Sequence, residues 1–134
     1  KVIIHADSTK KKPGSRHYVH VEDVANAVLF ILDNKDKIEQ SSKDNLGGNC
    51  TKVNIASSLE LDNLEIAQLI GEYLKKDINY ELVDYHSSRP GHDLRYALDG
   101  SVLKNLGWEA NKSNKDGLED VTKWYSDNQD WLRF

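Results

Sequence analysis

Two kinds of hydrophobic spacing alternate along this chain, and the alternation limits the folds that it can adopt. Residues 2–5 form a short β-branched run that is typical of a strand. From Val21 onward, hydrophobic residues recur every three or four positions, which predicts an amphipathic helix with that stripe buried. The stripe consists of Val21, Val24, Ala25, Val28, Ile31 and Leu32. A strand followed by an amphipathic helix is the opening pattern of an α/β fold.

The same alternation continues through the middle of the chain. Residues 34–49 are polar and contain two glycines near their end, which predicts a surface loop. Short strands are predicted at residues 52–55 and 80–83. Between them we expect a second amphipathic helix, whose free amides are capped by Asp62 or Asn63.

The last part of the chain is predicted to be helical. Asp99 opens a short helix that ends at Gly107, where a left-handed backbone is favoured. Ser113 and Asp116 resemble a capping box for a final helix. The stripe of this helix consists of Leu118, Val121, Trp124, Tyr125 and Trp131. We therefore expect one α/β domain of short strands with three to four helices, too small for a complete doubly wound sheet.

The charge and hydrophobicity of the chain exclude two classes of partner. The net charge of −4 at pH 7 and the pI near 5.7 argue against nucleic acid and against an anionic membrane, because both call for a broad basic surface. No hydrophobic run approaches the roughly 20 residues that cross a bilayer. We therefore expect a protein with neither partner.

The counts of cysteine, histidine and methionine lead to three further expectations. Cys50 is the single cysteine, which excludes an internal disulfide and a multi-cysteine metal site and fits a reducing compartment such as the cytoplasm. The five histidines show no repeated ligand spacing, so no metal site is predicted. The chain has no methionine, not even at position 1, and we interpret it as a fragment of a longer protein.

Three polar segments, each beside a chain breaker or a helix start, are candidates for one anion-binding pocket. The segments are residues 15–18, 62–63 and 89–93. Arg16 and Arg89 together would suit a diphosphate, because each planar guanidinium can make two parallel hydrogen bonds to phosphate oxygens. Asn63 would add a polar contact near free backbone amides. Spacing alone leaves an alternative, in which the arginines form surface ion pairs with carboxylates such as Glu22 or Asp93.

The sequence lacks the usual groups for cofactor binding and proton transfer. No glycine-rich dinucleotide turn follows a predicted strand, and no Tyr-x-x-x-Lys spacing occurs. His92 lies beside Asp93, but no nucleophile is near in sequence, so we interpret His92 as an ion-pair partner or a substrate contact and not as a catalytic group. We predict no catalytic residue in this chain and expect the chemistry to lie outside it.

Two runs of residues carry a family resemblance. Residues 15–25, Ser-Arg-His-Tyr-Val-His-Val-Glu-Asp-Val-Ala, resemble the stretch in extended short-chain dehydrogenases that leads from a substrate-contacting arginine into a helix. Many sugar epimerases and decarboxylases share this stretch. Residues 89–99, Arg-Pro-Gly-His-Asp-Leu-Arg-Tyr-Ala-Leu-Asp, followed by Leu-Gly-Trp at 106–108, are more specific. This second run resembles the signature of dTDP-glucose 4,6-dehydratases.

The resemblance implies that residues 1–134 form the carboxy-terminal nucleotide-sugar-binding domain of an NAD-dependent lyase. The complete enzyme would convert dTDP-glucose or UDP-glucose to the 4-keto-6-deoxy sugar nucleotide, as in the biosynthesis of deoxysugars such as rhamnose. Arg16 and Arg89 would bind the diphosphate, while Asn63 and His92 would contact the nucleotide part of the substrate. NAD, the catalytic residues and the helices of an expected homodimer would belong to the missing amino-terminal part. We therefore expect the fragment alone to be inactive.

Two other interpretations stay open from the sequence. A nucleotide-sugar epimerase or decarboxylase of the same superfamily would share residues 15–25 but not residues 89–96. A non-catalytic sugar-nucleotide-binding module would be a free-standing domain that has lost its catalytic half.

Overall fold

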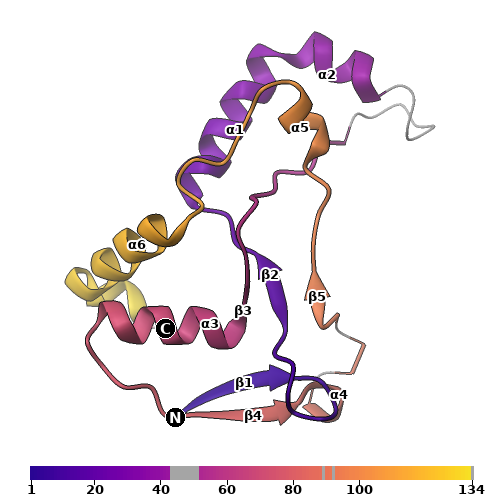
Figure 1. Cartoon of the computed structure of the whole chain (residues 1–134). Coiled ribbons are helices and arrows are strands. Elements are labelled where there is room, and N and C mark those ends of the chain that lie inside the picture. The colour runs from indigo at the N-terminus through magenta and orange to yellow at the C-terminus, as the bar shows by residue number, and fades with distance from the viewer. Residues whose placement is uncertain (43–51, 89, 92, 134) are drawn as a thin grey trace.

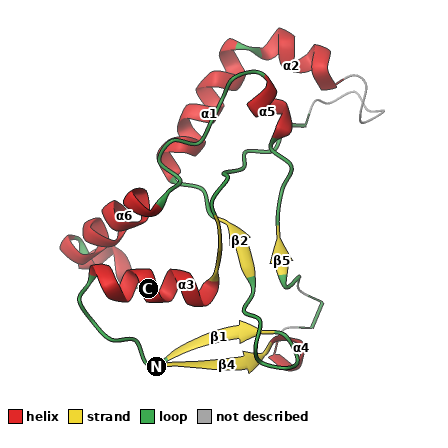
Figure 2. Cartoon of the chain, viewed as in Figure 1, coloured by secondary structure: helices red, strands yellow, loops and turns green. Residues whose placement is uncertain are grey.

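The computed structural model describes residues 1–42, 52–88, 90–91 and 93–133. Short strands form two separate small sheets, and helices lie around and beyond them (Figure 1). Helices are the predominant secondary structure, as Figure 2 shows. The predicted α/β class is confirmed, although the described residues form six α-helices where three to four were expected.

The first sheet pairs the start of the chain with a strand from its second half. Strand β1 (Val2–Ala6) runs parallel to β4 (Tyr80–Asp84), with Val2 opposite Tyr80 and Ala6 opposite Asp84. Ile4 and Ala6 are buried, whereas Val2 and Ile3 are exposed. Both strands lie where the hydrophobic spacing predicts them.

The second sheet brings three distant segments together. Strand β2 (Ser15–His17) is central, with β3 (Glu60–Asp62) antiparallel on one side and β5 (Arg95–Tyr96) parallel on the other. In this register Ser15 lies opposite both Asp62 and Arg95. The sheet therefore brings residues 15–17 beside Asp62 and beside Arg95 and Tyr96, which follow the third polar segment.

The predicted helix at Val21 is confirmed as α1 (Val21–Asp33), but the loop predicted after it is partly wrong. A second helix, α2 (Lys35–Ser42), follows directly after Asn34. This helix is mostly polar, but its one isoleucine, Ile38, is 2% exposed and packs in the core. Residues 43–49 of the predicted loop lie outside the described residues.

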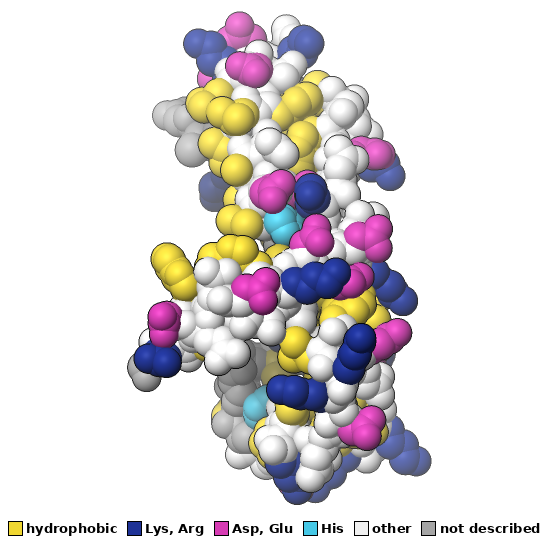
Figure 3. All heavy atoms as spheres, turned by 90° about the vertical axis from the view of Figure 1, so that its left-hand side faces the viewer, with side chains coloured by type: hydrophobic (Ala, Val, Ile, Leu, Met, Phe, Trp, Pro, Cys, Tyr) yellow, Lys and Arg dark blue, Asp and Glu magenta, His cyan; other side chains and the backbone are white. Residues whose placement is uncertain are grey.

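Most of the hydrophobic stripe of α1 is exposed, which contradicts the prediction that it is buried, and only Ile31 of the stripe packs against the core. Val21 is 73% exposed and Leu32 is 63% exposed, while the buried residues Asp23 and Ala27 lie on the opposite face of the helix. Figure 3 shows hydrophobic side chains gathered over this upper part of the molecule. The chain exposes 9725 Å² in total, whereas a compact protein of this mass exposes roughly 7,100 Å². The prediction is wrong because the described chain supplies no partner for that stripe.

The largest core cluster joins α1, α2 and α5 (Ser101–Asn105). It consists of Ala27, Ile38, Leu103 and Trp108, with partly buried side chains around them. Val53 and Ile55 pack against this cluster, but residues 52–55 do not form the predicted strand. The segment is held by side-chain packing instead of by a strand ladder.

The remaining helices confirm one predicted cap and correct another. Asp62 caps α3 (Asn63–Tyr73), and its carboxylate accepts from the backbone of Leu64 and Glu65 in a capping box. Helix α6 (Lys115–Asp127) is capped by Asn114 and not by the predicted Ser113. Helix α4 (Tyr85–Ser88) is a single turn, and the 3₁₀ helix η1 (Gln129–Leu132) follows α6 and contains Trp131.

Ser113 is unavailable as a cap because it bonds to Asp23, the buried carboxylate of α1. Asp23 is 2% exposed, and its oxygens accept from the Ser113 hydroxyl at 2.6 Å and from the Lys112 backbone at 3.0 and 3.1 Å. The same hydroxyl accepts from the His20 backbone at 2.8 Å. Burial by itself raises the pKa of Asp23, but these hydrogen bonds outweigh it and lower that pKa. Asp23 therefore fixes the segment before α6 to the start of α1.

In the part of the chain that the structure describes, no helix has both the length and the hydrophobicity that crossing a membrane requires.

We predict that Asp23→Asn lowers the free energy of unfolding by about 2–3 kcal/mol, because the amide nitrogen faces donors that the carboxylate satisfied. Urea unfolding monitored by circular dichroism measures the loss. The control is Asp33→Asn, which removes an exposed carboxylate from the last turn of the same helix. Equal stabilities of the two variants would contradict a structural role for Asp23.

Candidate functional site

The side chains of Arg16 and Asn63 approach each other beside Gly14. A methyl group added at Gly14 would lie 3.4 Å from Asn63 Nδ2 and 3.7 Å from Arg16 Nη1. The Gly14 carbonyl accepts from the Asn63 backbone at 2.9 Å, which fixes the start of α3 next to β2. Two of the four predicted site residues therefore come together, and glycine suits position 14 because the added methyl would also lie 3.2 Å from the Leu94 carbonyl oxygen.

Arg16 is half-buried and only partly satisfied by the protein. Its Nη1 donates to the carbonyl of Ser15 at 2.6 Å and to that of Leu94 at 3.3 Å, and its guanidinium lies 5.8 Å from the centre of the Tyr96 ring. Among the described residues Arg16 forms no ion pair, so the alternative pairing with Glu22 does not occur. A guanidinium carries five N–H groups. Those on Nε and Nη2 have no acceptor in the described chain and are free for an anion.

Asn63 is oriented by Tyr18. The phenol donates to Asn63 Oδ1 at 2.8 Å, so the amide NH₂ points away from that contact. Burial raises the pKa of Tyr18, which keeps the phenol protonated as a donor at neutral pH. The arrangement presents Asn63 as a donor beside Arg16.

The other two predicted site residues, Arg89 and His92, lie outside the described residues. The loop that carries them is described at Pro90, Gly91 and from residue 93 onward. Its end is tied to β2, because the Leu94 carbonyl accepts from both the Ser15 backbone and the Arg16 side chain. The described part of the loop therefore ends beside Arg16.

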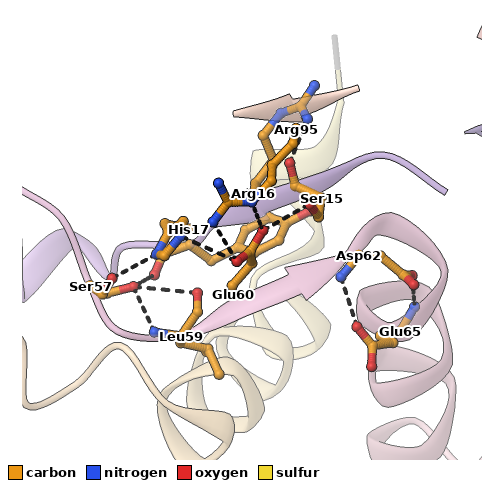
Figure 4. A network of polar contacts seen from close by, with 10 residues as sticks. Ser15, Arg16, His17, Ser57, Leu59, Glu60, Asp62, Glu65 and Arg95 are labelled. Atoms are coloured by element: carbon orange, nitrogen blue, oxygen red, sulfur yellow. Dashed lines mark hydrogen bonds and ion pairs between the residues drawn. The ribbon is translucent and has the colours of Figure 1, made fainter. Parts of the chain in front are cut away.

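A network centred on Glu60 joins all three strands of the second sheet (Figure 4). Arg95 on β5 donates twice to this carboxylate, from Nε at 2.6 Å and from Nη2 at 2.9 Å, and the Ser15 hydroxyl donates at 2.9 Å. Two parallel hydrogen bonds of this kind fix direction as well as distance. Glu60 thus holds β5, and with it the end of the loop at residues 89–93, against the strand that carries Arg16.

His17 completes the network on the side away from Asn63. Its Nδ1 lies 2.9 Å from the Ser57 carbonyl, which can only accept, so Nδ1 carries a proton. The other nitrogen, Nε2, lies 3.5 Å from Glu60 Oε2. The imidazole therefore links Glu60 to the segment that precedes β3.

Glu60 and Arg95 do not stand out as site residues in the sequence. They are separated by 35 residues, and Glu60 and Ser15 by 45, so no local spacing connects them. The sequence offers only one indication of their role, which is that both are charged residues within strands. Charged residues in strands are usually typical of a face exposed to solvent. Only the strand pairing brings them together.

The structure offers no fit for a dinucleotide or a metal ion among the described residues. The two longest helices that follow strands each begin with carboxylates: Glu22 and Asp23 in α1, and Asp62 and Glu65 at α3. These charges would repel a diphosphate at either helix start. No group of three histidine, cysteine or acidic side chains is arranged to hold a metal in residues 1–42, 52–88, 90–91 and 93–133.

We predict that Glu60→Gln makes stability less sensitive to acid. The hydrogen bonds from Arg95 and Ser15 lower the pKa of Glu60 from 4.5 to about 2. The stabilisation from the ionised carboxylate is thus complete above pH 4.5 and is lost as the pH falls toward 2. In this window the variant should take up about one proton fewer on unfolding. Urea unfolding at successive pH values measures the difference, and a curve that overlays that of the exposed control Glu39→Gln would refute it.

No protein-family model matches the chain, but most of the similar curated proteins share one name. The chain is 33% identical over 119 residues to a dTDP-glucose 4,6-dehydratase from Shigella flexneri, and 34% identical over 119 residues to one from Streptomyces niveus. Each match covers 87% of this chain and 31% of the relative. A probable GDP-L-fucose synthase from Oryza sativa subsp. japonica is 31% identical over 113 residues, covering 84% of this chain and 30% of the relative.

A solved structure gives the same assignment. The crystal structure of dTDP-glucose 4,6-dehydratase from Bacillus anthracis, in complex with NAD, superimposes with a TM-score of 0.68 at 25% sequence identity. The match covers 98% of this chain and 36% of that chain, and the curated relatives are likewise matched over about a third of their length. Sequence and fold therefore agree that this chain belongs to the dTDP-glucose 4,6-dehydratase family.

Proposed function

We propose that these 134 residues are the nucleotide-sugar-binding part of an NAD-dependent 4,6-dehydratase. The observation that carries the proposal is the junction at Gly14, where the guanidinium of Arg16 lies near the oriented amide of Asn63 and keeps N–H groups without an acceptor in the described chain. The family of the chain supports a nucleotide-activated glucose, carried by dTDP or UDP, as the ligand. Since the chain matches about a third of its relatives, the other residues of the enzyme would be supplied from outside it.

The proposed contacts of Arg16 and Asn63 use N–H groups that the described residues leave without an acceptor. Arg16 would bind the diphosphate through Nε and Nη2, which form the planar fork that phosphate oxygens fit. Asn63 would donate to the nucleotide part, with Tyr18 holding the amide in that orientation. Arg89 and His92 would approach from the loop whose end is fixed by Leu94 and, through Arg95, by Glu60. Glu60 would then set the separation between the two arginines.

In this proposal the catalytic residues and NAD belong to the part of the enzyme outside this chain. NAD would accept the hydride from C4 of the sugar and return it to C6 after water has been eliminated across C5 and C6. The residues described here would bind the nucleotide diphosphate and orient the sugar toward that cofactor. They would carry no proton in the reaction, so the chain alone should be inactive. We further propose that the complete enzyme is a cytoplasmic homodimer without nucleic-acid or membrane partners.

A second candidate is another nucleotide-sugar enzyme of the same superfamily, such as an epimerase or a decarboxylase. The similarity to a probable GDP-L-fucose synthase favours it, because that relative is matched over 84% of this chain. Both candidates would bind the diphosphate of the substrate with the same residues, and they differ in the product that the complete enzyme forms.

We predict that Arg16→Ala weakens the binding of dTDP or UDP by about tenfold or more, since a fork of charge-assisted hydrogen bonds is lost. The same substitution should weaken the binding of thymidine less, because thymidine has no phosphate. Calorimetric titration of the 134-residue chain measures all three ligands. The control is Arg133→Ala, which removes a fully solvated arginine that pairs with Asp130. If both variants bind dTDP equally well, Arg16 does not bind the diphosphate.

A further inference from the structure

A groove lined by aromatic side chains lies between the start of α1 and the end of the chain. It has a volume of about 620 Å³. Its lining includes Val19, His20, Val21 and Glu22 on one side and Asp120, Val121, Trp124, Tyr125 and Trp131 on the other. None of these residues belongs to the junction at Gly14, and the proposed binding of a nucleotide sugar makes no use of them.

The aromatic rings of the groove are more exposed than packing alone would leave them. Trp124 is 46% exposed and Trp131 is 68% exposed. The two indoles lie 5.8 Å apart with a tilt of 59°, and Tyr125 meets Trp124 edge-on at 5.0 Å. Tilted and edge-on rings present their electron-rich faces in different directions. A cation that entered the groove would therefore meet more than one ring face.

Two carboxylates without counter-ions line the same groove. Neither Glu22 nor Asp120 forms an ion pair within the described residues. Lys123, three positions after Asp120, pairs instead with Glu119 at 2.7 Å. His20 is engaged as well, because its Nδ1 accepts from the Glu22 backbone at 3.1 Å and so carries no proton. Negative charge and aromatic faces thus coincide in a groove whose lining contains no lysine or arginine.

We propose that this groove binds a polypeptide segment that presents an arginine flanked by hydrophobic residues. A guanidinium stacks on indole faces while its N–H groups reach a carboxylate, which a compact ammonium does less well. The aliphatic stem of the arginine and its neighbours match the valines of the lining. The volume also suits a short segment better than a single side chain, since ligand sites of 300–1,000 Å³ hold whole drug-sized molecules.

The test uses the ¹⁵N-labelled 134-residue chain and the peptide acetyl-Ala-Leu-Arg-Leu-Ala-amide. A second peptide carries citrulline, which has the shape of arginine without its charge. The indole N–H signals of Trp124 and Trp131 should shift on titration with the arginine peptide. Trp108, which is buried outside the groove, is the internal reference. The arginine peptide should bind about tenfold more tightly than the citrulline peptide, and added salt should reduce the difference.

Matched variants test whether Glu22 and Asp120 make the groove prefer the charged arginine peptide over the neutral citrulline peptide. Glu22→Gln with Asp120→Asn should bring the arginine peptide to the affinity of the citrulline peptide. The control, Asp36→Asn with Glu39→Gln, removes the same charge from exposed positions of α2 and should leave both affinities unchanged. If the first double variant fails to fold, Trp131→Ala serves in its place and should weaken the arginine peptide by about fivefold.

Three results would overturn the proposal. The first is equal affinity for both peptides, and the second is a shift confined to Trp108. The third is a dimer by light scattering in which Trp124 and Trp131 are protected, because a second copy would then occupy the groove.

Discussion

The buried carboxylate of Asp23 is the interaction on which the arrangement of this chain depends. It lies on the inner face of α1 and holds the segment before α6 by three hydrogen bonds. Through Ser113 the same contact reaches the His20 backbone, at the connection between β2 and α1. The helices and the sheet with Arg16 are therefore positioned around one desolvated charge, which is tolerated because its oxygens are satisfied.

Much of the fold follows from local sequence, and the exceptions share one cause. The spacing around Val21 and the polar start at Asp62 predict helices correctly, because periodicity and capping act within one or two turns. Ser113 has the character of a cap, yet it bonds to Asp23, a residue 90 positions away. Residues 52–55 have strand character without a strand partner, and Ile38 turns a polar segment into a packed helix. Each exception depends on a contact that no short window of sequence contains.

The same distinction separates the two parts of the candidate site. Arg16 and Asn63 can be recognised from residue type and from their positions beside a breaker and a helix start. Their proximity follows from the pairing of β2 with β3, in which Ser15 lies opposite Asp62. Glu60 and Arg95 have ordinary surface character in the sequence, and only the sheet makes them partners. The sequence thus indicates the proposed ligand-binding groups better than the groups that hold them in place.

The pairing of β1 with β4 affects how the chain reaches this structure. Val2 and Tyr80 must meet across nearly 80 residues, and closing so long a loop costs about 4 kcal/mol in chain entropy. The helices form from neighbouring residues and need no such closure, so the parallel pair is expected to assemble late in folding. Until then the β-branched start of the chain stays unpaired. A nascent chain would therefore expose the β-branched strand β1 from the time that it is made until β4 has been made.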